Sequence, residues 1–279
     1  MSVGCRITSN LIVLSVFFFT HPTIAQTPQP APAQLIHRVI ENELNAERND
    51  TSHWMFRLET ENKNGQKQVD EVVETKGGDL KRPIVIDGRE LNPKQRQQSD
   101  SQLGLNPEAL RKSVKDKSQD NAKSQRMLSM LPNAFIFSYG ERHGDLVQLL
   151  FKPNPTFHPR GREAEVFHAM QGNVWVNERQ NRLAGISGRL TESAKFGAGL
   201  LGHLDRGGTF NVKQQEVAPG YWELTVLDVQ MRGKALFFKT IAVHQKYSRS
   251  EFKQVPNDLT VAQATEMLKK QSKTQLSQR

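Results

Sequence analysis

The sequence has almost no cysteine. The only one, Cys5, lies ahead of the apolar run at residues 11–19. A disulfide framework or a cysteine metal site needs several thiols, so both are excluded. A lipoprotein signal needs a cysteine at its cleavage point, so we do not expect a lipid-anchored form. Stability must come from an ordinary hydrophobic core, which a chain of 279 residues can bury.

Long hydrophobic runs are also missing. The run LIVLSVFFF at 11–19 is shorter than the roughly 20 residues that a membrane-spanning helix needs, and no later run is longer. Arg6 precedes it, and Thr23-Ile24-Ala25 offers small residues at the outer positions of a cleavage site before Gln26. This pattern is typical of a secretory signal peptide. We therefore predict a cleavable signal peptide at 1–25 and export to the periplasm.

No catalytic or metal-binding signature is present. The 8 histidines are scattered and show no i, i+4 pair with a glutamate. Carboxylate pairs and serines occur, but nothing in the sequence fixes their spacing or places a serine in a nucleophile elbow. The chain is basic, yet it has no nucleic-acid-binding motif. We expect no catalytic residues, no metal, no cofactor and no nucleic-acid partner. The side chains considered were His158, His168, Glu163 with Glu165, Glu141 with Asp145, Ser129, Ser138 and Ser187.

The alternation of apolar and polar residues predicts an antiparallel β-meander with a helix at each end. A Pro-rich spacer at 26–33 precedes a single domain at 34–257, and a C-terminal helix and tail occupy 258–279. Thr260 and Gln263 have capping-box spacing at the start of that last helix. The predicted fold class is α+β. Expected helices are 35–44 and 162–170, and expected strands are 54–59, 72–75, 83–86, 134–139, 146–151, 172–177, 182–190, 210–212, 222–231 and 235–245.

A polar insertion at 92–126 interrupts the meander. It is rich in Gln, Lys, Arg and Ser, and its composition predicts a partly helical segment from Pro107 onward that can be mobile. Two interpretations of its charges stay open. Such a run is usually a solvated face, but each Lys or Arg near an anionic membrane surface adds about 1 kcal/mol to binding. Its cations are Lys94, Arg96, Arg111, Lys112, Lys115, Lys117, Lys123 and Arg126.

The segment GAGLLG at 197–202 matches G-x-G-x-x-G letter for letter. A dinucleotide site also needs a preceding strand and a following helix, and HLDRGG at 203–208 does not favour a helix. An ordinary glycine-rich loop is one interpretation. The other is an apolar lid or membrane-touching tip, because function concentrates on such loops. The lid candidates are Phe196, Leu200, Leu201 and Leu204.

The order of elements resembles the LolA/LolB-like lipoprotein-sorting superfamily. The segments that carry the resemblance are HWMFRLETE, DEVVETKGG, PIVIDGREL, GNVWVNERQNRL and YWELTVLDVQMRGKALFFKTIAV, which fall in order between residues 34 and 248. The resemblance implies a half-open antiparallel β-barrel covered by helices, whose concave side holds the acyl chains of a lipid or lipoprotein, with no enzyme activity and no cofactor. The basic insertion, the GAGLLG loop and the tail after Tyr247 depart from that pattern.

Alternating strand positions supply candidates for such a cavity, although each of them can equally be plain core. They are Trp54, Phe56, Leu58, Trp175, Trp222, Leu224, Phe237 and Ile241. Our first hypothesis is a periplasmic, non-enzymatic protein that binds a lipid or a lipidated chain. The second is an envelope structural or interaction module that docks on an anionic surface or a protein partner, and the third is a hydrolase whose site is unrecognised.

Overall fold

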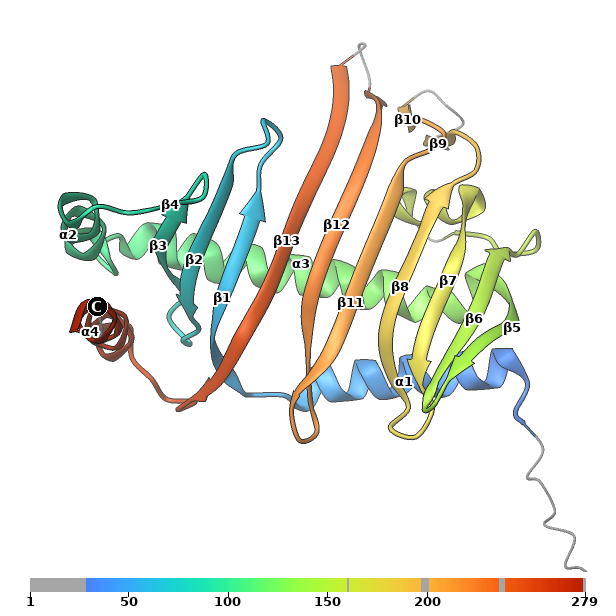
Figure 1. Ribbon diagram of the computed structural model, residues 1–279. Coiled ribbons are helices and arrows are strands. Elements are labelled where there is room, and N and C mark those ends of the chain that lie inside the picture. Colours follow the sequence, from blue (N-terminus) through green and yellow to red (C-terminus); the bar gives the residue numbers. More distant parts are fainter. Residues whose placement is uncertain (1–28, 160, 197–200, 236–238, 278–279) are drawn as a thin grey trace, which may run out of the picture. The chain divides into compact units, whose positions relative to one another are not determined.

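The computed structural model describes residues 29–159, 161–196, 201–235 and 239–277. Ala31–Arg279 forms one compact unit. It is an α+β protein built on a large, open antiparallel sheet with several helices (Figure 1). Within its described residues, none of the helices combines the length and apolar character that crossing a membrane requires.

The sheet has the strand order β4-β3-β2-β1-β13-β12-β11-β8-β7-β6-β5, with a small hairpin, β9 and β10, attached to β12. Every pair of neighbouring strands among the described residues is antiparallel. The strands are β1 (His53–Glu61), β2 (Lys67–Val73), β3 (Leu80–Ile86), β4 (Arg89–Glu90), β5 (Phe135–His143), β6 (Leu146–Pro153), β7 (Met170–Asn177), β8 (Arg182–Leu190), β9 (Ala194–Phe196), β10 (Gly202–Leu204), β11 (Thr209–Ala218), β12 (Tyr221–Ala235) and β13 (Lys239–Val255).

Two helices cross one face of this sheet. α1 (Pro32–Asn49) runs along one end of the strands, and the longer α3 (Pro107–Ala134) crosses their middle (Figure 1). We call the face that these helices cover the inner face. α2 (Pro93–Gln102), the 3-10 helix η1 (Arg162–Ala169) and α4 (Val261–Ser277) complete the chain. α2 and α4 lie at the β4 end of the sheet, and η1 lies near its β5 end.

Local sequence explains where the helices begin. α1 starts with a proline at its first turn, where a missing N–H costs no hydrogen bond. At α4, the Gln263 backbone N–H donates to Thr260 Oγ1 at 3.2 Å, and the Thr260 N–H donates to Gln263 Oε1 at 2.9 Å. This reciprocal pair is the capping box that the spacing predicts. Ala264 and Leu268 are fully buried, so this helix packs one edge against the rest of the protein.

A buried arginine joins the elements at the β4 end. Arg82 is 2% exposed, and its guanidinium donates to Glu71 at 3.2 Å, to Asp100 of α2 at 2.7 Å and to the Leu268 carbonyl of α4 at 3.3 Å. A buried charge is tolerated only when its hydrogen bonds are made. This set of contacts therefore fixes α2 and α4 against β2 and β3.

Most of the predicted elements are present. The short strands β4, β9 and β10 were not predicted, several strand bounds differ, and three further differences matter for the fold. The insertion 92–126 contains two helices, and α3 continues to Ala134 as a cover of the sheet. The last strand does not end at residue 245, because β13 continues to Val255 and pairs with β1. α1 begins at Pro32, inside the spacer predicted at 26–33.

Candidate functional site

The inner face carries continuous rows of apolar side chains. Residues directly opposed on neighbouring antiparallel strands point to the same face, so the strand register identifies each row. The first row runs across the middle of the sheet. The second row lies beside it, nearer the C-terminal end of β12. The first row is Tyr247, Leu227, Val212, Ile186, Val174, Leu149 and Tyr139, and the second contains Val229, Phe210, Phe151 and Phe137.

Glycines make room for the second row. A Cβ atom added to Gly188 would lie 2.8 Å from Phe210 Cζ and 2.4 Å from the Gln171 carbonyl oxygen. Real Cβ atoms do not approach backbone so closely, so this position accepts no side chain. The Phe210 ring therefore packs directly over the backbone of β8 and stays only 8% exposed.

α1 seals one end of the inner face. Leu35, Ile36 and Val39 are fully buried against the sheet. Glu43 of the same helix is 6% exposed and accepts hydrogen bonds from Arg182 Nε and from the Leu183 backbone N–H, both at 2.7 Å. Removing one partner of a buried ion pair typically costs about 3–5 kcal/mol. The pair therefore holds α1 firmly on β8.

α3 is fixed above β1 and β2 by a second charged group. Lys117 Nζ donates to Glu74 Oε1 at 2.8 Å, and Glu74 Oε2 accepts the Trp54 backbone N–H at 3.1 Å. Burial alone lowers the pKa of Lys117, but the carboxylates of Glu74 and Asp79 outweigh it and raise that pKa. The lysine thus stays charged and attached to the sheet.

Glu223 and Arg249 extend this group along the sheet. Burial, reinforced by the Glu74 carboxylate, raises the pKa of Glu223 to about 7, while the Arg249 guanidinium opposes the rise. The Arg249 guanidinium carbon lies 5.0 Å from the Phe56 ring centre and 5.4 Å from the Tyr247 ring centre. Its Nε atom is buried without a hydrogen-bond partner among the described residues. Together with Lys117 and Glu74, these two residues form a polar group at one end of the mainly apolar inner face.

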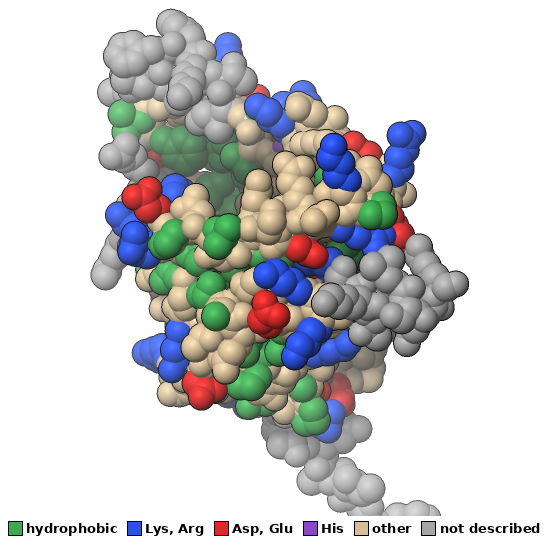
Figure 2. All heavy atoms as spheres, turned by 90° about the vertical axis from the view of Figure 1, so that its left-hand side faces the viewer, with side chains coloured by type: hydrophobic (Ala, Val, Ile, Leu, Met, Phe, Trp, Pro, Cys, Tyr) green, Lys and Arg blue, Asp and Glu red, His purple; other side chains and the backbone are tan. Residues whose placement is uncertain are grey.

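Among the described residues, no helix covers the inner face beside the C-terminal end of β12 (Figure 1). Val243 of β13 is 40% exposed although it lies opposite Met231, which packs against the main core. Val229 and Leu204 are also only partly buried at this core. Figure 2 shows a hollow with hydrophobic side chains in its upper part, beside atoms that the structure does not describe. We call this open region, defined by Val229, Met231, Val243 and Leu204, the apolar hollow.

The predicted cavity residues divide between several places. Trp54, Phe56 and Leu58 lie on the inner face but are 2–7% exposed, in a closed cluster with Val72. Trp175 alternates with the buried Val174 and Val176, so it lies on the opposite, outer face. There its ring stacks on that of His143, with the two ring centres 5.4 Å apart. Trp175 is therefore excluded from this site.

The other cavity candidates do not line the hollow either, or are not described. Trp222 lies near the β7–β8 turn, where its Nε1 donates to Gln180 Oε1 at 2.7 Å and Arg182 lies over its ring. Leu224 is half-buried and belongs to none of the three described core clusters. Phe237 and the side chain of Ile241 fall outside the described part of the structure.

The lid candidates flank the apolar hollow where they are described. Phe196 ends β9 and is half-buried, Leu201 is 37% exposed, and Leu204 of β10 packs against the core. Leu200 and the rest of 197–200 fall outside the described residues. β9 and β10 pair as an antiparallel hairpin. A strand follows the glycines where a dinucleotide site requires a helix, so the G-x-G-x-x-G interpretation is excluded.

A second cleft lies between α4 and the strands, with a volume of about 410 Å³. Its lining includes Met55, Arg57, Glu251, Lys253 and Met267. Arg57 pairs with Glu251 at 2.7 Å, and Glu251 adopts a φ of 57° at an irregularity of β13. Its lining mixes charged side chains with the two methionines, so it suits an apolar ligand less well than the inner face does.

Sequence reasoning missed the residues that define the hollow. Val229, Met231 and Val243 are ordinary aliphatic strand residues, whereas most of the predicted cavity residues are aromatic. The signal that was available is their alternation within 222–245, which assigns them to one face. Among the described residues there is no group of three or more His, Cys, Asp and Glu side chains that could hold a metal ion.

Comparison with protein-family models, with curated proteins and with solved structures gave no match. The functional argument therefore rests on the residues of this chain. An apolar face that helices cover incompletely, with a polar group at its far side, can hold a ligand with a long alkyl chain.

Proposed function

We propose that this protein is an exported, non-enzymatic binding protein that holds the acyl chains of a lipid or of a lipidated protein on the inner face of its sheet. In this proposal the sheet and its helices act as a half-open barrel of the LolA-like kind, and the protein works in the periplasm. The observation that carries the proposal is the apolar hollow, where Val243 stays 40% exposed beside the main core.

The chemistry of the hollow supports an alkyl ligand. Each CH₂ group that moves from water into an apolar site gains about 0.8 kcal/mol. The strand residues of the hollow continue the buried rows of the inner face. A chain lying along them meets mainly hydrocarbon, with Gln245, opposite Val229, as a polar neighbour. The sequence features that predict export support this proposal, because a periplasmic protein would work beside the membranes that supply lipids and lipidated chains.

The first test is native mass spectrometry, with lipid extraction, of protein purified from its own envelope fraction. A stoichiometric bound lipid or acyl chain is the expected result. A protein that carries no lipid, and that also fails to bind a fluorescent fatty acid added to it, would contradict the proposal.

A double variant, Met231→Gln with Val243→Gln, locates the site. We expect fluorescent fatty acid to bind about tenfold more weakly, because polar groups replace apolar surface in the hollow. The matched control is Ile136→Gln with Leu150→Gln, which changes two outer-face residues that are 45% and 44% exposed. Equal losses in both double variants would place the ligand elsewhere.

A further inference from the structure

The two ends of the sheet differ in how their charges are satisfied. The strand pairing puts four features at one end of the sheet: the C-terminal end of β12, the β1–β2 turn, the end of β8 and the end of β6. Here the cations are exposed and have no ion-pair partner among the described residues. We call this set the cationic rim: Lys63, Lys67, Arg89, Lys152, Arg189, Lys195, Arg206, Arg232 and Lys234.

Acidic side chains at this end do not neutralise the rim. Glu61 is paired with Lys246 at 2.9 Å, and Asp205 lies 3.2 Å from His203. Asp87 accepts the Lys67 backbone N–H at 2.9 Å, and Glu192 is exposed and forms no ion pair with a described residue. Cations therefore predominate at the end of the strands where the apolar hollow opens.

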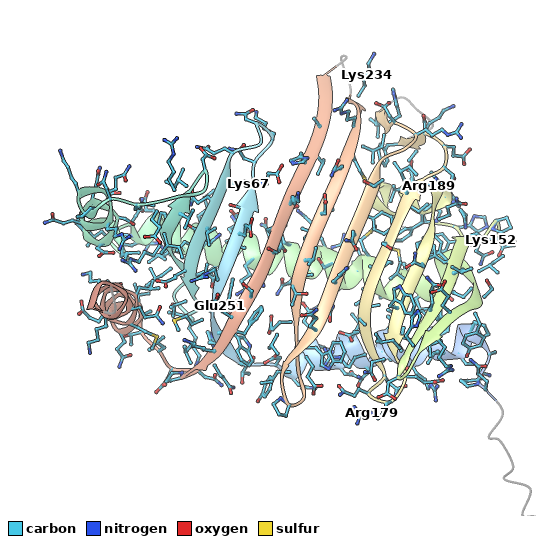
Figure 3. All side chains as sticks on the ribbon, in the orientation of Figure 1. Lys67, Lys152, Arg179, Arg189, Lys234 and Glu251 are labelled. Carbon is cyan, nitrogen blue, oxygen red and sulfur yellow. The ribbon has the colours of Figure 1, made fainter. Side chains whose placement is uncertain are left out.

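At the opposite end three arginines are held in ion pairs, while Arg38, Lys76 and Lys253 are exposed. Arg142 contacts Glu178 at 2.7 Å, Arg179 contacts Asp145 at 2.8 Å, and Arg182 contacts Glu43 at 2.7 Å. Figure 3 shows Lys67, Lys152, Arg189 and Lys234 in the upper half of the view and Arg179 at the lower end. The rim therefore gathers nine exposed cations, without an ion pair to any described residue, at the end that α1 does not seal.

We propose that the cationic rim docks on an anionic phospholipid bilayer, so that the apolar hollow faces the membrane from which acyl chains enter or leave. The inference rests on the proposed function and adds its partner surface. Charge complementarity carries it: polybasic surfaces bind anionic lipids, with about 1 kcal/mol for each Lys or Arg near the surface. The geometry adds that the rim and the hollow share one end of the sheet.

This docking surface differs from the one that the sequence suggested. The cations of the insertion 92–126 lie on α2 and α3, across the middle of the inner face and at the β4 edge (Figure 1). A membrane bound there would contact the outer side of the covering helix, away from the hollow. The two surfaces can therefore be compared directly.

The experiment uses the full processed protein and sedimentation with vesicles of equal parts phosphatidylcholine and phosphatidylglycerol. The rim variant carries Lys67→Gln, Lys152→Gln, Arg189→Gln and Lys234→Gln. The matched control removes the same number of exposed, unpaired cations from the helices, by Lys94→Gln, Arg111→Gln, Lys115→Gln and Arg126→Gln. Both variants have the same net charge, so any difference between them reports position.

We expect the rim variant to bind these vesicles about a hundredfold more weakly, and the helix variant to bind within about threefold of the unaltered protein. Binding should also fall at high salt and be lost on vesicles of phosphatidylcholine alone. Equal loss in both variants, or strong binding to the uncharged vesicles, would overturn the inference.

A separate readout distinguishes this inference from the proposed function. In the absence of vesicles, the rim variant should bind fluorescent fatty acid as the unaltered protein does. If the rim variant still docks while fatty acid binds normally, only the rim inference fails. If the unaltered protein docks through the rim but binds no fatty acid, the rim stands as a docking surface and the carrier function fails.

Discussion

Glu223 is the residue through which pH is expected to act on stability. Burial first, and then the nearby Glu74 carboxylate, raise its pKa from 4.5 to about 7. The folded protein therefore holds this proton more tightly than the unfolded chain does. The stability that this proton contributes is complete below about pH 4.5 and is lost as the pH rises through about 7.

The Glu223→Gln substitution should remove this pH dependence. We expect the variant to be more stable than the unaltered protein at pH 8, by up to about 3 kcal/mol, and to differ little from it near pH 4. Urea unfolding at both pH values measures the difference, and Glu192→Gln is the control because Glu192 is exposed. The remaining titrating groups are the same in the unaltered protein and in the Glu223→Gln variant. Their contributions to the pH dependence therefore cancel in the difference between the two. The same pH slope in the unaltered protein and in Glu223→Gln would contradict the assignment.

Single residues also show where the sequence was and was not sufficient. Alternation correctly places Trp54, Phe56 and Leu58 together on one face of β1. It could not place Trp175, because the period fixes which residues share a face but does not say which face meets the helices. The smaller Val174 and Val176 take the core positions of that strand. Preferring the largest apolar side chain was therefore misleading.

At the scale of elements, α1 stabilises the fold through one apolar stripe. Ile36 is fully buried, whereas His37, the next residue, is exposed. We expect Ile36→Ala to lower the free energy of unfolding by about 2–5 kcal/mol, because it leaves a cavity against the sheet. His37→Ala should change it by less than about 0.5 kcal/mol. Urea unfolding of both variants provides the measurement, and similar effects would show that α1 does not pack on the sheet through this stripe.

The helices of the insertion were only partly predictable. Its sequence has few large apolar residues, and much of α3 exposes its side chains. Leu131 near its C-terminal end is buried, and Met127 and Leu128 pack against the core. Lys117 adds the ion pair to Glu74. The contacts that hold this helix down join residues far apart in the chain, which a local pattern cannot show.

The length of β13 has a similar explanation. Residues 246–255, KYSRSEFKQV, are too polar to predict a strand with confidence from alternation alone. They form one because β1 pairs with them, from Glu61 opposite Lys246 to His53 opposite Val255. This pairing connects the β1–β4 portion to the β5–β12 portion. The segment that departed from the resemblance is thus the centre of the sheet.

At the scale of the whole molecule, apolar surface and free positive charge meet at one end of the sheet. α1 and the paired charges close the other end, so a ligand would enter where the strands extend past α3 (Figure 1). The apolar hollow and the cationic rim are made of different residues. Their contributions can therefore be separated by substitution, since sites without shared partners act nearly independently.

This separation leads to a prediction for transfer of a fluorescent fatty acid between vesicles. The Met231→Gln, Val243→Gln variant should dock on anionic vesicles normally but transfer little fatty acid, because the hollow no longer retains the chain. The rim variant should bind the fatty acid normally but transfer it more slowly than the unaltered protein does. This difference in transfer rate should grow on more anionic vesicles. It should diminish at high salt, because salt also screens the docking of the unaltered protein. Combining both sets of substitutions should lower the transfer rate by the product of the separate effects. If the hollow variant loses docking and the rim variant loses fatty acid binding, the two features belong to one site and the division drawn between them is wrong.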